Sequence, residues 1–173
     1  MFVLTLLYYI FISFQVLFVN LQDSESPPEP EKELKEYDWN VWCKLQPNGN
    51  DCTKKGVFLS RFYYDIVLED CKTFSYGRCE ASINNFETIT QCHDTCRDFG
   101  VQPLKGNYSD KVKCRLQPDF GDCNEYHPMF YYDIVERRCK GFSFSGCGGN
   151  DNRFTNAQQC VSVCSKLMDA EVY

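Results

Sequence analysis

Apolar and polar residues divide the chain into three parts. Residues 1–20 are almost entirely apolar and include no charged side chain. Residues 22–40 are polar and acidic, and from residue 41 onward short aromatic runs alternate with polar segments. This pattern predicts an N-terminal leader, a tail that cannot form a core of its own, and a folded region that begins near residue 41.

Two aromatic and β-branched runs, Phe58–Ile66 and Phe130–Val135, have the composition of strands. Short turns lead back into Lys72–Tyr76 and Lys140–Phe144, so each run is expected to form one arm of a hairpin. The aromatic side chains of these runs are most simply core residues.

A helix is predicted after each hairpin. Thr88 with Gln91, and Asn156 with Gln159, have the spacing of a capping box, which satisfies free amide groups at a helix N-terminus. In each predicted helix two cysteines lie four residues apart and therefore face one side, from which they can tie the helix to the rest of the fold. These cysteines are Cys92 and Cys96 in the first helix and Cys160 and Cys164 in the second.

The apolar segment 1–21 is interpreted as a signal peptide. No Lys or Arg precedes the apolar run and no small-residue cleavage motif follows it, so cleavage is placed broadly between Val19 and Ser26. The alternative is an uncleaved anchor helix, since roughly 20 apolar residues can span a bilayer. With the segment removed, we expect a secreted, extracellular protein with no stable membrane association.

The acidic segment 22–40 is expected to be a disordered tail. It holds seven acidic and two basic residues, so it carries −5 of the chain's net charge of −6. Pro27, Pro28 and Pro30 prevent a helix in its first part. Tyr37 lies between two acidic residues and is a candidate for sulfation, although a solubilising tail is the simpler interpretation. The rest of the chain is nearly neutral and offers no basic face for nucleic acid.

The chain contains 12 cysteines, none of them before Cys43, and only two histidines, His93 and His127. The sequence has none of the C-x2-C pairs typical of zinc ribbons. The cysteines therefore indicate a disulfide framework formed in an oxidising compartment, with no metal or other cofactor. With every thiol assigned to a disulfide and no catalytic motif around the histidines, we expect no enzymatic activity.

The cysteines form two sets of six with nearly the same spacing. The first, third, fourth and fifth gaps hold eight, seven, twelve and three residues in both sets, whereas the second gap holds 18 residues in the first set and 15 in the second. Arg61–Asp65 resembles Met129–Asp133, and Thr73–Gly77 resembles Gly141–Ser145. We infer one duplicated module. The predicted organisation is a first module at 41–97, a linker at 98–112, a second module at 113–165 and a C-terminal tail at 166–173.

Each module has only about 55–60 residues, too few for a hydrophobic core to stabilise it alone. Three disulfides, each contributing about 2–4 kcal/mol mainly by restricting the unfolded chain, compensate for the small core. Six cysteines allow 15 pairings, and spacing alone does not choose among them.

The second module resembles a Kunitz domain, the family of bovine pancreatic trypsin inhibitor, in its cysteine spacing, in Phe130-Tyr131-Tyr132-Asp133 and in Asn152-x-Phe154. The resemblance extends over both modules, roughly residues 43–164. It implies a small disulfide-rich α+β fold: two tandem Kunitz domains, each a twisted β-hairpin plus a C-terminal helix with three disulfides. The implied pairs are Cys43–Cys96, Cys52–Cys79, Cys71–Cys92, Cys114–Cys164, Cys123–Cys147 and Cys139–Cys160.

The resemblance also implies inhibition of a serine protease. Kunitz inhibitors present an extended strand around the second cysteine to the enzyme's cleft. The second-to-fourth disulfide keeps this strand in shape, so little ordering entropy is lost on binding. The residue directly after the second cysteine fills the enzyme's primary pocket and sets specificity.

In the second module this residue is Asn124, followed by Glu125 and Tyr126. Gly121 keeps the glycine that the family prefers before the loop. Trypsin-like enzymes have a carboxylate at the floor of the pocket that pairs with Arg or Lys, and Asn would leave it unpaired. Because Asp122 and Glu125 add repulsion, we do not expect strong inhibition of trypsin-like enzymes by this loop.

In the first module the corresponding residue is Thr53, followed by Lys54 and Lys55, in a segment three residues longer. Asn50 and Arg78 stand where the family has glycines. Three interpretations remain open. Thr53 enters a small, elastase-like pocket; the insertion shifts the register so that a lysine reaches a trypsin-like pocket; or this loop no longer inhibits by the standard route.

Modules without Arg or Lys directly after the second cysteine are similar to a narrower group, the ixolaris-like two-domain Kunitz proteins of tick saliva. This resemblance implies an anticoagulant that uses factor X or Xa as a scaffold to reach factor VIIa through exosite contacts. Arg137, Arg138 and Lys140 form a small basic cluster at a hairpin turn and are the candidate exosite. The alternative for this cluster is a solvated strand end.

The linker contains an N-glycosylation sequon at Asn107. Gly100, Pro103 and Gly106 indicate a flexible linker that would let both modules contact one target.

The leading prediction is a secreted, monomeric serine protease inhibitor. The alternative is a non-inhibitory Kunitz toxin that binds an ion channel or receptor, which the insertion and Arg78 favour for the first module. A purely structural extracellular module is the third option.

Overall fold

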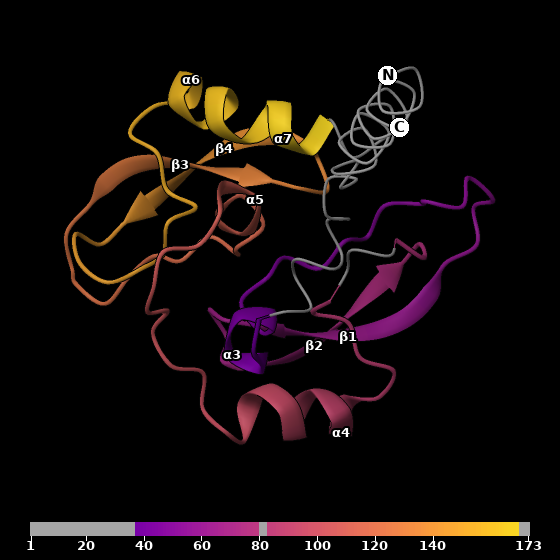
Figure 1. Ribbon diagram of the computed structural model, residues 1–173. Helices are drawn as coiled ribbons and strands as arrows, with labels where there is room; N and C mark the ends of the chain where they lie inside the picture. Colours follow the sequence, from indigo (N-terminus) through magenta and orange to yellow (C-terminus); the bar gives the residue numbers. More distant parts are fainter. Residues whose placement is uncertain (1–36, 80–82, 170–173) are drawn as a thin grey trace, which may run out of the picture.

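The computed structural model describes residues 37–79 and 83–169 (Figure 1). The predicted signal peptide and the acidic tail up to residue 36 lie outside these residues, as does the end of the C-terminal tail, 170–173. None of the helices in the described ranges has the length and apolar character needed to cross a membrane.

Each module consists of a short N-terminal helix, an antiparallel hairpin and a C-terminal helix (Figure 1). This confirms the predicted small disulfide-rich α+β fold. The first module contains α3 (Trp39–Trp42), β1 (Leu59–Asp65), β2 (Asp70–Tyr76), α4 (Ile89–Cys92) and the π-helical turn η1 (His93–Arg97). The second contains α5 (Asp110–Lys113), β3 (His127–Asp133), β4 (Arg138–Phe144), α6 (Ala157–Cys160), the π-helical turn η2 (Val161–Ser165) and α7 (Lys166–Asp169).

An aspartate ends the first strand of each hairpin. Asp65 Oδ1 accepts the amides of the two residues at 67 and 68 at 3.0 and 3.1 Å, and Asp133 Oδ1 accepts those at 135 and 136, both at 2.9 Å. The predicted second strand, Phe130–Val135, therefore ends earlier than expected, because Asp133 turns the chain. The same strand begins earlier, at His127, because its register with β4 brings His127 opposite Phe144.

The two C-terminal helices begin at the predicted capping residues. At Thr88 the capping box is complete, since the Thr88 hydroxyl accepts the Gln91 amide and the Gln91 side chain accepts the Thr88 amide. At Asn156 the side chain accepts the Gln159 amide at 2.9 Å, but Gln159 Oε1 bonds to Thr155 instead. Both helices are therefore anchored at their first turn.

All six disulfides have the pairing that the family resemblance implied. Around two of them in each module, a buried tyrosine and a buried asparagine form the centre of the core. In the second module, Asn152 Nδ2 lies 2.8 and 3.1 Å from the carbonyl oxygens of Leu116 and Tyr132, and its Oδ1 accepts the Tyr132 amide at 2.9 Å. Asn84 makes the corresponding bonds in the first module, including one of 2.9 Å to the carbonyl of Tyr64.

The folded regions begin before the boundaries predicted from the sequence. Residues 37–40, expected in the disordered tail, include the N-cap Asp38 and the start of α3, while 110–112, expected in the linker, belong to α5 with Ser109 as its N-cap. Both helical turns are ordered by an apolar residue, Val41 or Val112, that is fully buried. In the same way, residues 166–169 of the predicted C-terminal tail form α7, because Met168 packs into the core.

The segment between the modules also packs against the protein rather than hanging free. The amide of Gln102 donates to Asn40 Oδ1 at 2.8 Å, and Leu104 and Tyr108 lie against a buried apolar cluster shared by the modules. The flexible linker expected from its glycines is therefore not what the structure contains. Tyr37, the candidate for sulfation, packs its ring against Tyr108 with centroids 5.5 Å apart.

Candidate functional site

The second module presents residues Gly121–Tyr126 as an exposed loop between α5 and β3. The disulfide Cys123–Cys147 ties this loop to the segment that follows β4. Backbone hydrogen bonds add two more ties, from the Asp122 amide to the Cys147 carbonyl at 3.0 Å and from the Glu125 amide to the Ser145 carbonyl at 2.9 Å. The loop backbone is thus fixed while its side chains at 124–126 remain exposed, with Tyr126 76% accessible.

Gly121 is required where this loop begins. Its φ of +82° lies in the left-handed region, and a Cβ atom at this position would collide with the Cys147 carbonyl oxygen and the Ser145 hydroxyl. The family glycine identified in the sequence therefore has a steric reason. It lets two backbone segments approach closely enough to be joined by the disulfide.

The surface of the second loop is acidic. Glu125 Oε2 lies at hydrogen-bond distance, 2.7 Å, from His127 Nε2, and Asp122 lies exposed before Cys123. Lys44 of the first module lies near this loop; burial lowers the pKa of its ammonium, and Asp119 and Asp122 act in the opposite direction. The loop therefore has no cation of its own to present at Asn124, as the sequence predicted.

The first loop has a different shape despite the matching disulfide, Cys52–Cys79. Asp51 folds it into a turn, since its carboxylate accepts the Thr53 amide at 3.2 Å, the Thr53 hydroxyl at 2.9 Å and the Gly56 amide at 2.6 Å. Lys54 and Gly56 both have positive φ, +56° and +65°. Thr53 is therefore bonded back to the loop instead of lying in an extended strand, and Lys54 and Lys55 are exposed at the tip.

The position of Arg78 explains how the first module tolerates the loss of a family glycine. Its φ is +63°, and Gly146 at the corresponding place before the fourth cysteine has φ +102°. The arginine is exposed, so it adopts a left-handed backbone without a steric clash of its side chain, at a conformational cost of about 1–2 kcal/mol. Gly77, in contrast, is buried and lies against the Asn50 carbonyl.

The basic cluster at the second hairpin turn is largely neutralised. Lys140 Nζ lies 2.9 Å from Glu136 and 3.1 Å from Asp133, and these bonds raise its pKa. Arg138 pairs with Glu136 as well. Arg137, exposed at the tip with φ +51°, is the member of the cluster without an ion pair among the described residues. The cluster also lies at the opposite end of β3 from the loop, and the 7 residues of this strand span about 20 Å at 3.3 Å per residue.

One group of side chains in the described ranges has the proximity of metal ligands: Asp70, Cys71 and His93. The sulfur of Cys71 is bonded to Cys92, and His93 Nε2 already lies 3.0 Å from Asp70. These residues are therefore explained by a disulfide and a side-chain hydrogen bond.

Comparison with known proteins places these loops in context. The sequence profile of the Kunitz/Bovine pancreatic trypsin inhibitor domain matches residues 42–97 and 113–165. Kunitz-type serine protease inhibitor A of Rhipicephalus microplus is 33% identical over 122 residues, which are 70% of this chain and 92% of that protein. Tissue factor pathway inhibitor 2 of Bos taurus is 30% identical over 142 residues, which are 82% of this chain and 53% of that protein. The NMR structure of Ixolaris is 25% identical and covers 73% of this chain and 97% of its own, with a TM-score of 0.29, too low to support a structural comparison.

Replacing Gly121 tests the geometry of the second loop. Gly121→Ala should lower the free energy of unfolding by about 2–3 kcal/mol, because a left-handed backbone and a clash with Cys147 are both imposed. Gly141→Ala is the matched control, since its nearest neighbour is 3.9 Å from the added Cβ. Guanidinium unfolding with the disulfides intact measures both. Equal stability of the two variants would contradict the steric role assigned to Gly121.

The turn in the first loop should depend on pH through Asp51. The hydrogen bond from the Gly56 amide is the largest cause that lowers the pKa of this carboxyl below its ordinary 3.8. Because the folded protein has the lower pKa, the stability that this turn contributes is fully present at a pH above the ordinary pKa. It is lost as the pH falls through the lower pKa of the folded state. In an NMR titration, the Gly56 amide shift should have its midpoint below 3.8, and Asp51→Asn should remove the transition. A midpoint at or above the ordinary value would contradict this account.

Proposed function

Because the chain belongs to the Kunitz/bovine pancreatic trypsin inhibitor family, we propose that it is a secreted serine protease inhibitor whose second module enters the enzyme's cleft. The expected resemblance to tandem Kunitz inhibitors, including a tick protein, is confirmed. Members of this family inhibit proteases and are not themselves enzymes. The observation that carries the proposal is the second loop, fixed by Cys123–Cys147 and two backbone hydrogen bonds with Asn124 exposed at its centre.

The class of protease follows from the residue at the centre of the loop. Asn124 is neutral and lies between acidic residues, so an enzyme with a carboxylate in its primary pocket gains no ion pair from it. Direct insertion therefore suits an enzyme with a small, uncharged pocket, of the elastase type. Since the loop is held in shape before binding, the ordering entropy lost on association is small.

The first loop has a different part in this proposal. A strand that lies across a protease cleft must be extended, whereas Asp51 and the left-handed Lys54 fold this loop into a turn. We therefore assign no cleft insertion to Thr53. Lys54 and Lys55 instead form an exposed basic tip suited to an acidic surface on a partner, which is also the feature that favours the alternative function, binding of an ion channel or receptor.

The finer proposal is an anticoagulant action on the tissue factor pathway. A relative carries the name Tissue factor pathway inhibitor 2, and factors VIIa, X and Xa are the partners we propose for this chain. Because Asn124 offers no cation to a trypsin-like primary pocket, contact would be made through an exosite. Within the cluster expected for that role, Arg137 is the residue with an unpaired charge among the described residues.

Secretion and glycosylation form part of the same proposal. The predicted signal peptide directs the chain to the compartment in which six disulfides form. Asn107 is exposed in the segment between the modules, where a glycan can be attached.

Exchanging the central residue of each loop tests cleft insertion. Wild-type protein is titrated against elastase, chymotrypsin, trypsin, factor Xa and factor VIIa–tissue factor. Asn124→Arg should gain trypsin inhibition by about 100-fold or more, since a paired carboxylate is worth about 3 kcal/mol or more and each 1.4 kcal/mol is tenfold. It should lose any inhibition of elastase. Thr53→Arg is the matched control and should change trypsin inhibition by less than about tenfold.

If neither the wild type nor Asn124→Arg inhibits any of these enzymes, and the protein binds a channel, the proposal is overturned in favour of the alternative. A gain in trypsin inhibition with Thr53→Arg equal to that with Asn124→Arg would show that the first loop also inserts.

The anticoagulant proposal has its own test. Wild-type protein should prolong tissue-factor-initiated clotting in plasma, and it should inhibit purified factor VIIa–tissue factor only when factor X is present. Arg137→Glu should weaken binding to factor X by about tenfold, because it reverses the unpaired charge at the hairpin tip. Lys105→Glu, an exposed change in the segment between the modules, is the control. No effect on clotting, or equal effects of both variants, would contradict an exosite at this turn.

A further inference from the structure

The two modules contact each other through equivalent residues. Residues before the insertion correspond to those 71 positions later, as Leu45 does to Leu116, and residues after it to those 68 positions later, as Tyr64 does to Tyr132. These two leucines form an antiparallel bridge. The amides of Gln46 and Gln117 each donate to a backbone carbonyl of the other module, at 2.7 and 2.8 Å. The interface therefore has approximate two-fold symmetry.

The side chain of Gln46 crosses into the second module. Its Nε2 donates to the carbonyl oxygens of Leu116 and Tyr132 at 2.9 and 2.7 Å. Its Oε1 accepts the amide of Ile134 at 3.1 Å. Asn152 bonds to the same two carbonyls from inside the second module, so Gln46 completes the buried polar centre of a module to which it does not belong.

Gln117 makes the reciprocal contacts in the first module. Its Nε2 donates to the Tyr64 carbonyl at 2.8 Å, and its Oε1 accepts the Ile66 amide at 3.3 Å. The Tyr64 carbonyl is also bonded to Asn84. Both glutamines are buried, with 8% and 6% of their surface exposed. Separating the modules would break these hydrogen bonds and expose both amide groups to water, and the net loss of protein–protein hydrogen bonds opposes independent motion.

Apolar packing surrounds the exchanged glutamines. One buried cluster takes equivalent residues from both modules, and the equivalent tyrosines Tyr37 and Tyr108 pack at its edge with their rings tilted by 54°. The buried residues are Val41, Leu45, Val112 and Leu116. Each module contributes two of these four residues, so a module on its own does not keep the cluster.

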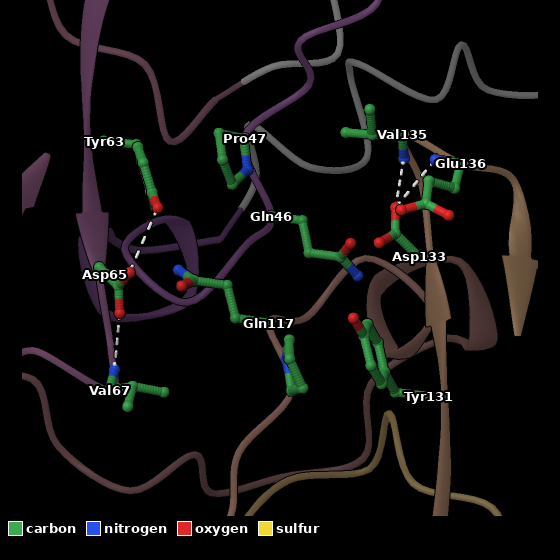
Figure 2. A pocket seen from close by; sticks show the side chains of 11 residues that line it. Gln46, Pro47, Tyr63, Asp65, Val67, Gln117, Tyr131, Asp133, Val135 and Glu136 are labelled. Atoms are coloured by element: carbon green, nitrogen blue, oxygen red, sulfur yellow. Dashed lines mark hydrogen bonds between the residues drawn. The ribbon is translucent and has the colours of Figure 1, made fainter. Parts of the chain in front are cut away.

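A symmetric cavity of about 340 Å³ lies beside this interface. Figure 2 shows Gln46 and Gln117 across its centre, with Tyr63 and Asp65 on one side and Tyr131 and Asp133 on the other. The two carboxylates are already paired within their own hairpins, to Lys72 and Lys140. The cavity therefore lies at the boundary between the modules, and the two glutamines join its walls by hydrogen bonds across this boundary.

The antiparallel bridge also sets the directions of the two loops. From Leu45 and Leu116 the chains leave the interface in opposite directions, and each reaches its loop within about ten residues. Figure 1 accordingly shows the first loop, in purple, at the right edge of the molecule and the second loop, in orange, at the left edge. A protease that covers one loop therefore faces away from the other.

We propose that the two modules form one rigid body, held together by the reciprocal exchange of Gln46 and Gln117, and that this body presents its loops at opposite ends to two separate partner molecules. The second half of this proposal rests on the proposed protease-binding function of the second loop. Tandem domains in one chain are mobile by default, and the glutamine exchange is what makes this pair different. One enzyme cannot then be held by both loops at once.

Rigidity is tested without any partner. In the full chain, ¹⁵N relaxation should give both modules one rotational correlation time, that of a body the size of the two modules together. In the double variant Gln46→Ala, Gln117→Ala, each correlation time should fall toward that of a body half the size. Gln158→Ala, an exposed glutamine on α6, should leave the wild-type values unchanged. Wild-type correlation times that differ between the modules, or that match a body half the size, would overturn the proposal, even if the double variant does not fold.

The direction of the loops is tested by spin labels attached through unnatural residues at Lys55 and Tyr126, with all disulfides intact. Pulsed EPR should give one narrow, long distance in the wild-type background and a broad distribution in the double variant. When the Asn124→Arg background is saturated with trypsin, the label at 126 should be immobilised and the label at 55 should stay mobile. Immobilisation of both labels by one trypsin molecule would overturn the opposite orientation. If trypsin fails to bind, only the proposed function is contradicted. The opposite orientation of the loops is still tested by the distance between the labels in the free protein.

Discussion

The disulfide between the second and fourth cysteines of each module is the constraint on which both loops depend. A module of this size buries too little apolar surface to hold an exposed loop in one conformation. The bond between Cys123 and Cys147 joins the loop to the strand end behind it, and the absence of a side chain at Gly121 makes that approach sterically possible. The rest of the core, built on Tyr132 and Asn152, supports the two segments that this disulfide joins.

The same disulfide constraint gives two different loop conformations, because the loops differ in length and only the first is folded by the carboxylate of Asp51. In the first module three additional residues give the chain room to turn, and Asp51 collects three hydrogen bonds that stabilise the turn. In the second module the shorter segment is held by its backbone bonds to Ser145 and Cys147. Duplication has thus produced one loop fixed by two backbone hydrogen bonds and one that folds into a compact basic tip, on a common framework.

Packing between the modules turns two small domains into a larger unit. Each module alone would expose Leu45 or Leu116 and would leave backbone groups near its buried asparagine without the glutamine that now bonds to them. The association is governed by the same physics as the cores, namely burial of apolar area and satisfaction of buried polar groups. The relative direction of the two loops then follows from the antiparallel bridge at the centre of the interface between the modules.

The sequence by itself determined the duplicated fold, the hairpins, the helix starts and, through the family resemblance, the disulfide pairs, because these depend on local composition and on cysteine spacing. It also located Asn124 and the glycine before it. It could not reveal the turn around Asp51, the neutralisation of Arg138 and Lys140, or the roles of Gln46 and Gln117, since each depends on residues brought together by folding. Polar side chains such as glutamine carry no periodic signal, and only the tertiary structure decided which carbonyl groups lie within their reach.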